Sequence, residues 1–364
     1  MPNKAKRNST QFACMTIALC AVMQVFFSSS CAALFAGQCV DRDLSKSISI
    51  RKNASDDTQL SFDNWLGPQT TLRATGSVTG DDKDLKAGFE KRALWGGSYY
   101  AGGDLIVRRW NEPEFNLAGG GADLYAGRQM TPTVKLYTLY RLNRLDVNDT
   151  DSASDPDFSR RAGKNITSAA SINLSRSTLN CELYPTTGSQ VDLTAESAFK
   201  ALGADYNFSR YEANAALYRT PVGKITLAAH FKAGWVQGFG TSDGVPFFER
   251  YFVGSSSTVR GFKWGTAGLR SAQGTPLGGN ILLLGSLEAR FPLYKKLQGA
   301  LFFDSGRTFS KVEEVSHLDL REGAGFGLRY LTPWFVARAD CGFAVDRRNE
   351  ESAANAYVTI GLPF

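Results

Sequence analysis

The stretch Lys224-Ile-Thr-Leu-Ala-Ala-His-Phe-Lys-Ala-Gly-Trp-Val236 decides the fold, because apolar and polar side chains alternate along it. Every second residue from Ile225 to Trp235 is apolar, whereas the positions between them include His230 and Lys232. Successive side chains of a β-strand point to opposite faces of the sheet. The segment therefore predicts a strand with one apolar and one polar face.

The same alternation recurs from about residue 45 to the end, for example in Leu283–Phe291, Val191–Glu196 and Tyr357–Phe364. A soluble β-sandwich would alternate too. However, the segments run for about 9–13 residues, which matches a tilted crossing of a bilayer. We count about 16 segments, an even number as in bacterial single-chain barrels. The sequence thus predicts an all-β protein, a transmembrane antiparallel β-barrel of about 16 strands.

The connections between these segments alternate in length. Tight polar turns such as Tyr184–Ser189 and Arg219–Lys224 separate much longer connections, notably Asp146–Lys164, Gln237–Leu277 and Ser305–Leu320. Short turns at one end and long loops at the other are typical of outer-membrane barrels. Because Asp146–Lys164 is acidic and rich in serine, we expect a solvated loop there.

Composition excludes several other classes of protein. The formal net charge of +6 is spread along 364 residues, so no clustered basic patch indicates a nucleic-acid partner. Cys39, Cys181 and Cys341 follow the N-terminal segment at wide spacing and indicate neither a disulfide framework nor a metal or cofactor site. Gly254–Thr258 lacks the pattern of a nucleophile elbow, and Gly119–Gly121 is expected to form a turn. We therefore expect that the protein is not an enzyme and that it binds no cofactor.

The N-terminus has the pattern of an export signal. Lys4, Lys6 and Arg7 precede an uncharged, mostly apolar stretch, and small residues lead up to Ala33. We expect a signal peptide over residues 1–33, a short periplasmic lead over 34–44 and the barrel over 45–364. A retained membrane anchor is the alternative. The expected location is the outer membrane of a Gram-negative-type bacterium, or alternatively an organellar outer envelope.

The longest connection contains the most specific motif, Pro246-Phe-Phe-Glu-Arg-Tyr-Phe-Val-Gly-Ser-Ser-Ser-Thr-Val-Arg-Gly-Phe262. Its last four residues are Val259, Arg260, Gly261 and Phe262. The stretch resembles the signature loop of the BamA/TamA (bacterial surface antigen) family of outer-membrane assembly barrels. Ser255 departs from the resemblance, because the family commonly has a second glycine there. Further matches follow in the family's order: Gly278–Asn280, Ser286–Pro292, Phe302–Gly306 and Gly361–Phe364.

The resemblance implies that this loop folds into the barrel and that Arg260 pairs with acidic residues of the inner wall. The alternation places Glu288 and Asp304 on the inward face, so we expect them to be the partners. A guanidinium group in a narrow interior needs carboxylates, and bidentate pairs of this kind are strong and directional. The alternative is that these are ordinary interior charges screened by water.

The final strand resembles the signal by which assembly machinery recognises outer-membrane clients. A last strand is an unpaired edge before the barrel closes, and such an edge can dock by strand addition. A strand whose terminal aromatic merely anchors at the membrane interface is the alternative. The residues of this expected signal are Tyr357, Val358, Ile360, Leu362 and Phe364.

The resemblance to the BamA/TamA family predicts a role in inserting or translocating proteins at the outer membrane. Family members carry periplasmic POTRA domains, for which the stretch before residue 45 has no room. We therefore expect a barrel domain without POTRA domains, and a separate periplasmic partner could supply them. The other expected partners are the lipid bilayer and outer-membrane protein clients. We also expect a weak seam between the first and last strands, around Ser45–Asn53 and Ala356–Phe364. The alternative function is a passive or gated channel, or a structural barrel without insertase activity.

Overall fold

The computed structural model describes residues 47–52, 58–63, 69–79, 82–95, 97–112, 115–148, 156–181, 184–240, 244–317, 319–332, 336–348 and 351–361. The chain divides into two units, Met1–Asp41 and Arg42–Phe364, and every described residue belongs to the second. The expected signal peptide and most of the lead make up the first unit. Both segments, together with Leu362 and Phe364, lie outside the described residues.

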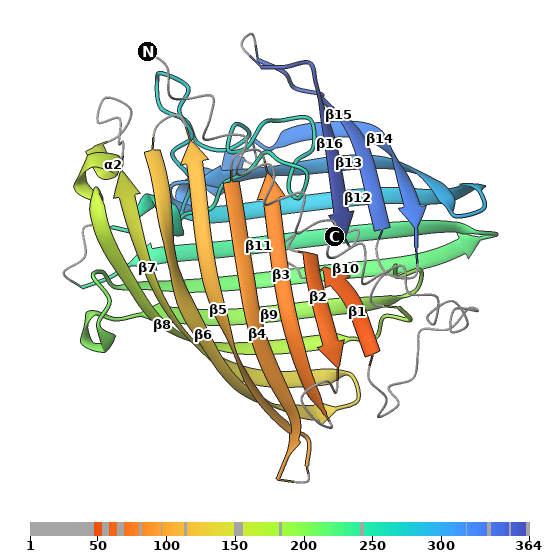
Figure 1. Cartoon of the computed structure of the whole chain (residues 1–364). Coiled ribbons are helices and arrows are strands. Elements are labelled where there is room, and N and C mark those ends of the chain that lie inside the picture. Colours follow the sequence, from red (N-terminus) through yellow and green to blue (C-terminus); the bar gives the residue numbers. More distant parts are fainter. Residues whose placement is uncertain are drawn as a thin grey trace, which may run out of the picture. The chain divides into compact units, whose positions relative to one another are not determined.

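The described residues form one antiparallel sheet of sixteen strands, in which each strand pairs with its neighbours in the chain (Figure 1). The prediction of an all-β barrel of about 16 strands is confirmed. The strands are β1 (Ser47–Lys52), β2 (Thr58–Asp63), β3 (Thr70–Thr79), β4 (Asp82–Leu94), β5 (Tyr99–Glu112), β6 (Phe115–Thr131), β7 (Val134–Asn148), β8 (Gly163–Ser177), β9 (Gly188–Ala198), β10 (Phe208–Val222), β11 (Ile225–Gly238), β12 (Ile281–Tyr294), β13 (Leu297–Phe309), β14 (Arg321–Leu331), β15 (Val336–Ala344) and β16 (Ala354–Gly361). Short helices lie in the connections: α2 (Pro156–Arg160), η1 (Lys200–Leu202), η2 (Phe247–Glu249) and η3 (Val312–His317).

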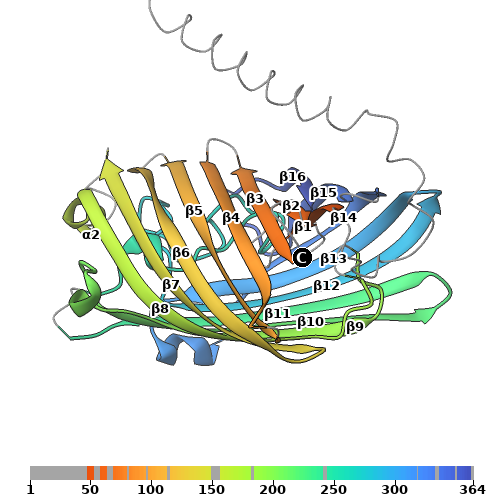
Figure 2. The ribbon, with the colours of Figure 1, turned by 60° about the horizontal axis from the view of Figure 1, so that its bottom comes forward.

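The sheet curls so that its first and last strands approach each other (Figure 2). Some Cα atoms of β16 lie within 8 Å of Cα atoms in β1 and β2. Within the described ranges, however, no hydrogen-bonded register joins β1 to β16, and these strands are the two ends of the sheet order. None of the described helices is long and apolar enough to cross a membrane.

The outer face of the barrel is apolar. In β11, Leu227, Phe231 and Trp235 are 48%, 50% and 40% exposed, while Ala228 and Val236 on the opposite face are buried. Large apolar side chains on neighbouring strands are exposed in the same alternating way. A continuous apolar surface across neighbouring strands would be unfavourable in water but matches the hydrocarbon region of a bilayer.

The two ends of the barrel differ in the length of their connections. Turns of two residues join β6 to β7, β10 to β11 and β12 to β13, and we call this the short-turn end. The opposite end contains the three longest connections, residues 149–162, 239–280 and 310–320, although connections of two residues also join β3 to β4 and β5 to β6 there. This alternation agrees with the pattern expected from the sequence.

Two local expectations are wrong. Gly119–Gly121 lie inside β6 rather than in a turn, because glycine lets β6 approach the backbone of β7 closely. A Cβ atom on Gly119 would lie 2.1 Å from the carbonyl oxygen of Arg144. The described part of Asp146–Lys164 is not simply solvated, because Phe158 in α2 is fully buried.

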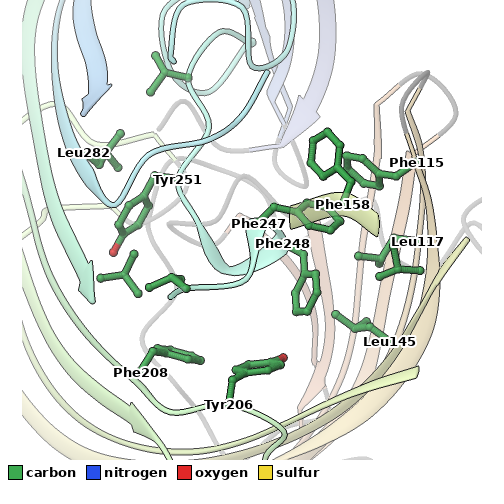
Figure 3. Packing of buried hydrophobic residues seen from close by; sticks show 14 of the residues in the cluster. Phe115, Leu117, Leu145, Phe158, Tyr206, Phe208, Phe247, Phe248, Tyr251 and Leu282 are labelled. Carbon is green, nitrogen blue, oxygen red and sulfur yellow. The ribbon is translucent and has the colours of Figure 1, made fainter. Parts of the chain in front are cut away.

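Phe158 belongs to an aromatic cluster in the interior of the barrel (Figure 3). The ring of Phe247 from η2 lies with its centroid 4.7 Å from those of Phe115 and Phe158. Phe248 packs against Tyr206 at 5.9 Å. The apolar core therefore lies between the barrel wall and the long connection after β11, which places that connection inside the barrel.

Candidate functional site

Residues 244–280, here called the lumen loop, form a folded segment within the barrel. The backbone groups of Tyr251 and Gly279 exchange two hydrogen bonds of 2.9 Å, which closes the loop on itself. The Ala267 N–H donates to the carbonyl of Val253 at 3.0 Å, and both residues are fully buried. The loop therefore has a core of its own and presents particular side chains to the wall.

Arg260 lies at the centre of the contact between the lumen loop and the wall. Its Nε and Nη2 donate to the two carboxylate oxygens of Asp304 in β13, at 2.7 and 2.8 Å, and its Nη1 donates to Glu288 in β12 at 2.9 Å. The ring of Phe302 lies 3.5 Å from the guanidinium carbon. Arg260 is only 2% exposed. The structure thus brings together Arg260, Glu288 and Asp304, the arginine and the two carboxylates that the sequence predicted as partners.

Burial by itself would lower the pKa of Arg260, because it disfavours a charged guanidinium. The hydrogen bonds and charges of Asp304 and Glu288 outweigh this and raise its pKa above the ordinary value. Arg260 therefore stays charged, and its attraction to the wall acts with little solvent screening.

Glu288 is a hub for several wall arginines. It accepts hydrogen bonds from Arg290 at 2.8 Å and Arg329 at 3.0 Å in addition to the one from Arg260. Arg329 also donates to Asp340 at 2.6 Å. Because Glu288, Arg290 and Arg329 are at most 2% exposed, the network excludes water almost completely. Such networks rigidify a structure when every charge has a partner.

Glycines in the wall make room for the loop backbone. A Cβ atom on Gly323 in β14 would lie 1.9 Å from the carbonyl oxygen of Arg260, and one on Gly342 in β15 would lie 2.5 Å from the Gly261 nitrogen. Gly261 itself has φ of 109°, a conformation that side chains rarely tolerate. The Arg260–Gly261 peptide therefore lies directly on the wall, at a distance that only glycine permits.

The last strand is bound to the same part of the loop. The Tyr357 hydroxyl accepts from the Gly261 N–H at 3.1 Å and donates to the carbonyl of Phe262 at 2.7 Å. Asn355 donates to the Gly261 carbonyl at 2.6 Å. Phe262 is 2% exposed, and its ring lies 4.6 Å from the guanidinium carbon of Arg321. The loop thereby fixes the inner face of β16, and Val259 beside it is fully buried.

The other expected residues of the last strand behave differently. Val358 points outward and is 82% exposed, as the alternation requires. The side chain of Ile360 is not described, and Leu362 and Phe364 lie beyond the described residues. Ser255, where the family commonly has glycine, contacts Thr258 through its hydroxyl at 3.1 Å in a turn of the loop.

A second anchor of the lumen loop was not predicted from the sequence. Glu249 in η2 accepts from Arg210 at 2.8 Å, Arg141 at 3.2 Å and Thr167 at 3.0 Å. Both arginines also bind Glu196 in β9. At Arg260 the loop supplies a cation to wall carboxylates, whereas at Glu249 it supplies an anion to wall guanidinium groups. The signal that could have revealed it is a single acidic residue directly after the apolar pair Phe247 and Phe248.

Acidification should weaken this second anchor. Burial alone would raise the pKa of Glu249, but Arg141 and Arg210 outweigh burial and lower the pKa from 4.5 to about 2. A group with a lowered pKa stabilises the fold above its unfolded pKa, and this contribution disappears as the pH falls from about 4.5 to about 2. The shift corresponds to about 3 kcal/mol.

The measurement is the urea midpoint of unfolding in detergent micelles at pH 6 and pH 3. Glu249→Gln should lower the midpoint at pH 6 and flatten the dependence on pH. Glu313→Gln is the control, because it removes an exposed carboxylate in η3, within the connection between β13 and β14. Equal pH dependence in the wild type and Glu249→Gln would contradict the assignment.

The described residues contain no group of three or more His, Cys, Asp or Glu side chains placed to hold a metal ion. Cys181 and Cys341 are free thiols.

Comparison with known proteins agrees with this architecture. Residues 64–364 match the Omp85 superfamily domain. The chain is 28% identical over 231 residues to the outer membrane protein assembly factor BamA of Nitratidesulfovibrio vulgaris, which covers 62% of this chain and 29% of that protein. The chain thus spans less than a third of the length of this relative.

Solved structures show the same fold. BamA of Haemophilus ducreyi lacking POTRA domains 1–3 superposes with a TM-score of 0.69 at 16% identity, covering 88% of this chain and 71% of that one. CdiB of Escherichia coli superposes with a TM-score of 0.57 at 14% identity, covering 89% and 63%. The resemblance to the BamA/TamA family is confirmed for the barrel region, and the location is the outer membrane. With a matching domain over most of its length and a loop bound inside a sixteen-stranded barrel, the chain belongs to the Omp85 superfamily.

Proposed function

We propose that this barrel takes part in inserting or translocating proteins at the outer membrane. The observation that carries the proposal is the junction between β1 and β16, where the described residues form no ladder although the strands lie close together. A strand edge offers unpaired backbone groups to another chain. A client strand can add to that edge and gain hydrogen bonds that lipid cannot supply.

The lumen loop has a defined part in this proposal. Tyr357 and Asn355 bind the loop backbone, so β16 is held to the rigid network around Arg260. The seam can then open by movement of β1 while β16 keeps its place as a template. Client outer-membrane proteins would dock their own last strands here, and a separate periplasmic partner with POTRA-like domains would deliver them.

Depletion of the protein in its host should lower the amounts of other barrels in the outer membrane. Re-expression of the wild type should restore them, and so should Lys263→Ala, which alters an exposed cation of the same loop. Purified protein in vesicles should also speed the folding of a urea-unfolded client barrel. Normal barrel levels after depletion, with no acceleration in vesicles, would contradict the proposal.

A gated channel or structural barrel without insertase activity is the second candidate. The observation that favours it is the interior position of the lumen loop, which occupies space that an open pore would leave to water. In planar bilayers this candidate predicts conductance steps that widen in Arg260→Ala. If neither the wild type nor Arg260→Ala conducts in planar bilayers, the channel candidate is excluded.

A further inference from the structure

Exposed basic side chains lie along part of the short-turn end, from β6 to the turn after β12. For the arginines within strands the outward direction follows from the registers, because paired residues share a face of the sheet. Lys224, Lys295 and Lys296 are exposed residues of two-residue turns. Arg128 pairs with Leu136 and Arg219 pairs with Leu227, and both leucines belong to the exposed apolar face. We call the following six residues the basic rim: Arg128, Arg176, Arg219, Lys224, Lys295 and Lys296.

Where the structure describes side chains, exposed carboxylates occur at the opposite end. Among the residues whose side chains the structure describes, the exposed carboxylates all lie in the long connections: Asp205, Glu313, Asp319 and Asp346. No described carboxylate forms an ion pair with a residue of the basic rim. With respect to the described residues, the rim therefore presents unpaired positive charge on the outer surface from β6 to the turn after β12.

Aromatic rings accompany the rim. The guanidinium carbon of Arg128 lies 5.1 Å from the ring centre of Tyr99, and the ammonium of Lys295 lies 5.0 Å from that of Tyr294. Tyr294 is 67% exposed, and Trp95, next to Tyr99, is 88% exposed. Rings with one apolar and one polar end settle at the level of lipid headgroups. The rim therefore lies at the height of the headgroups in one leaflet.

We propose that the basic rim binds the headgroups of anionic phospholipids in the leaflet next to the short turns. The rim residues extend from β6 to the turn after β12, directly beyond the apolar face that contacts lipid tails. A leaflet can contact all of them at once, which a compact acidic protein cannot. Basic groups near an anionic surface attract it, and the attraction weakens as salt screens it.

The test uses the full chain reconstituted in phosphatidylcholine vesicles that contain a trace of spin-labelled lipid. We expect spin-labelled phosphatidylglycerol to associate with the wild type more than about fivefold better than spin-labelled phosphatidylcholine, and less so in high salt. Replacing all six rim residues with glutamine should bring the two lipids to equal association. Because these side chains are exposed, circular dichroism should show an unchanged barrel.

A matched variant removes the same numbers of arginines and lysines from the opposite end and should keep the preference. It replaces six other exposed residues with glutamine: Arg144, Arg160, Arg347, Lys164, Lys200 and Lys311. If both variants lose the preference for phosphatidylglycerol equally, net charge alone determines that preference, which overturns the proposal. Equal association of both lipids with the wild type would overturn it as well and leave an acidic protein as the occupant. The outcome does not depend on the proposed function.

Discussion

Replacing Arg260 with alanine should lower the free energy of unfolding of the barrel by about 3–5 kcal/mol, because two buried carboxylates lose their shared cation. Asp304 would lose both of its charge-assisted hydrogen bonds from the guanidinium, and Glu288 would lose one of three. The ring of Phe302 would also lose the cation that lies over it. The measurement is the urea midpoint followed by tryptophan fluorescence in detergent micelles.

Two controls separate the pair from a general loss of charge. Arg260→Lys keeps the charge but cannot bind Asp304 through two parallel hydrogen bonds, so its loss should be intermediate. Lys263→Ala removes an exposed cation three positions later and should change stability by less than about 0.5 kcal/mol. If Arg260→Ala unfolds at the same urea concentration as Lys263→Ala, Arg260 does not anchor the loop.

Replacing Glu288 with glutamine should lower the free energy of unfolding at least as much as Arg260→Ala does. Glutamine fits the same space, but its amide nitrogen would replace one carboxylate oxygen and face N–H groups either of Arg290 or of both Arg260 and Arg329, which can only donate. Removing this carboxylate leaves buried guanidinium groups without their common partner, and we expect a loss of about 3–5 kcal/mol. The lumen loop should also become accessible to protease at residues that are now buried.

Glu313→Gln is again the matched control, because it makes the same change on the surface. The double variant Arg260→Ala with Glu288→Gln should cost less than the sum of the single variants, since the removed charges interact. Strict additivity would show that the two side chains do not act as a unit.

The fold could be predicted from the sequence because lipid imposes a simple rule on every strand. The alternation in Lys224–Val236 has to repeat in each crossing, so one segment indicates the whole barrel. The prediction was wrong at Gly119–Gly121, where local propensity favours a turn. There, close approach of β6 to β7 decides the conformation, and no single segment reveals it.

Part of the site could be predicted for a related reason. The resemblance singled out Arg260, and the alternation placed Glu288 and Asp304 on the inner wall. Glu249 was missed, because its partners Arg141 and Arg210 come from strands far from it in the chain. Gly323 and Gly342 were missed as well, since the need for glycine arises only when the loop lies on the wall. Contacts that depend on the closed interior are therefore the ones that sequence reasoning cannot supply.

The strictly sequential order of the sheet has a consequence for how the molecule is built. Each strand can pair with the one before it, so the described ladders join residues at most 64 positions apart, the separation of Thr226 and Arg290 in β11 and β12. The inner segment adds a contact of longer range, because it joins Glu249 to Arg141, 108 positions earlier. Because closing a longer loop costs more entropy, we expect Glu249 to dock only after the strands have paired.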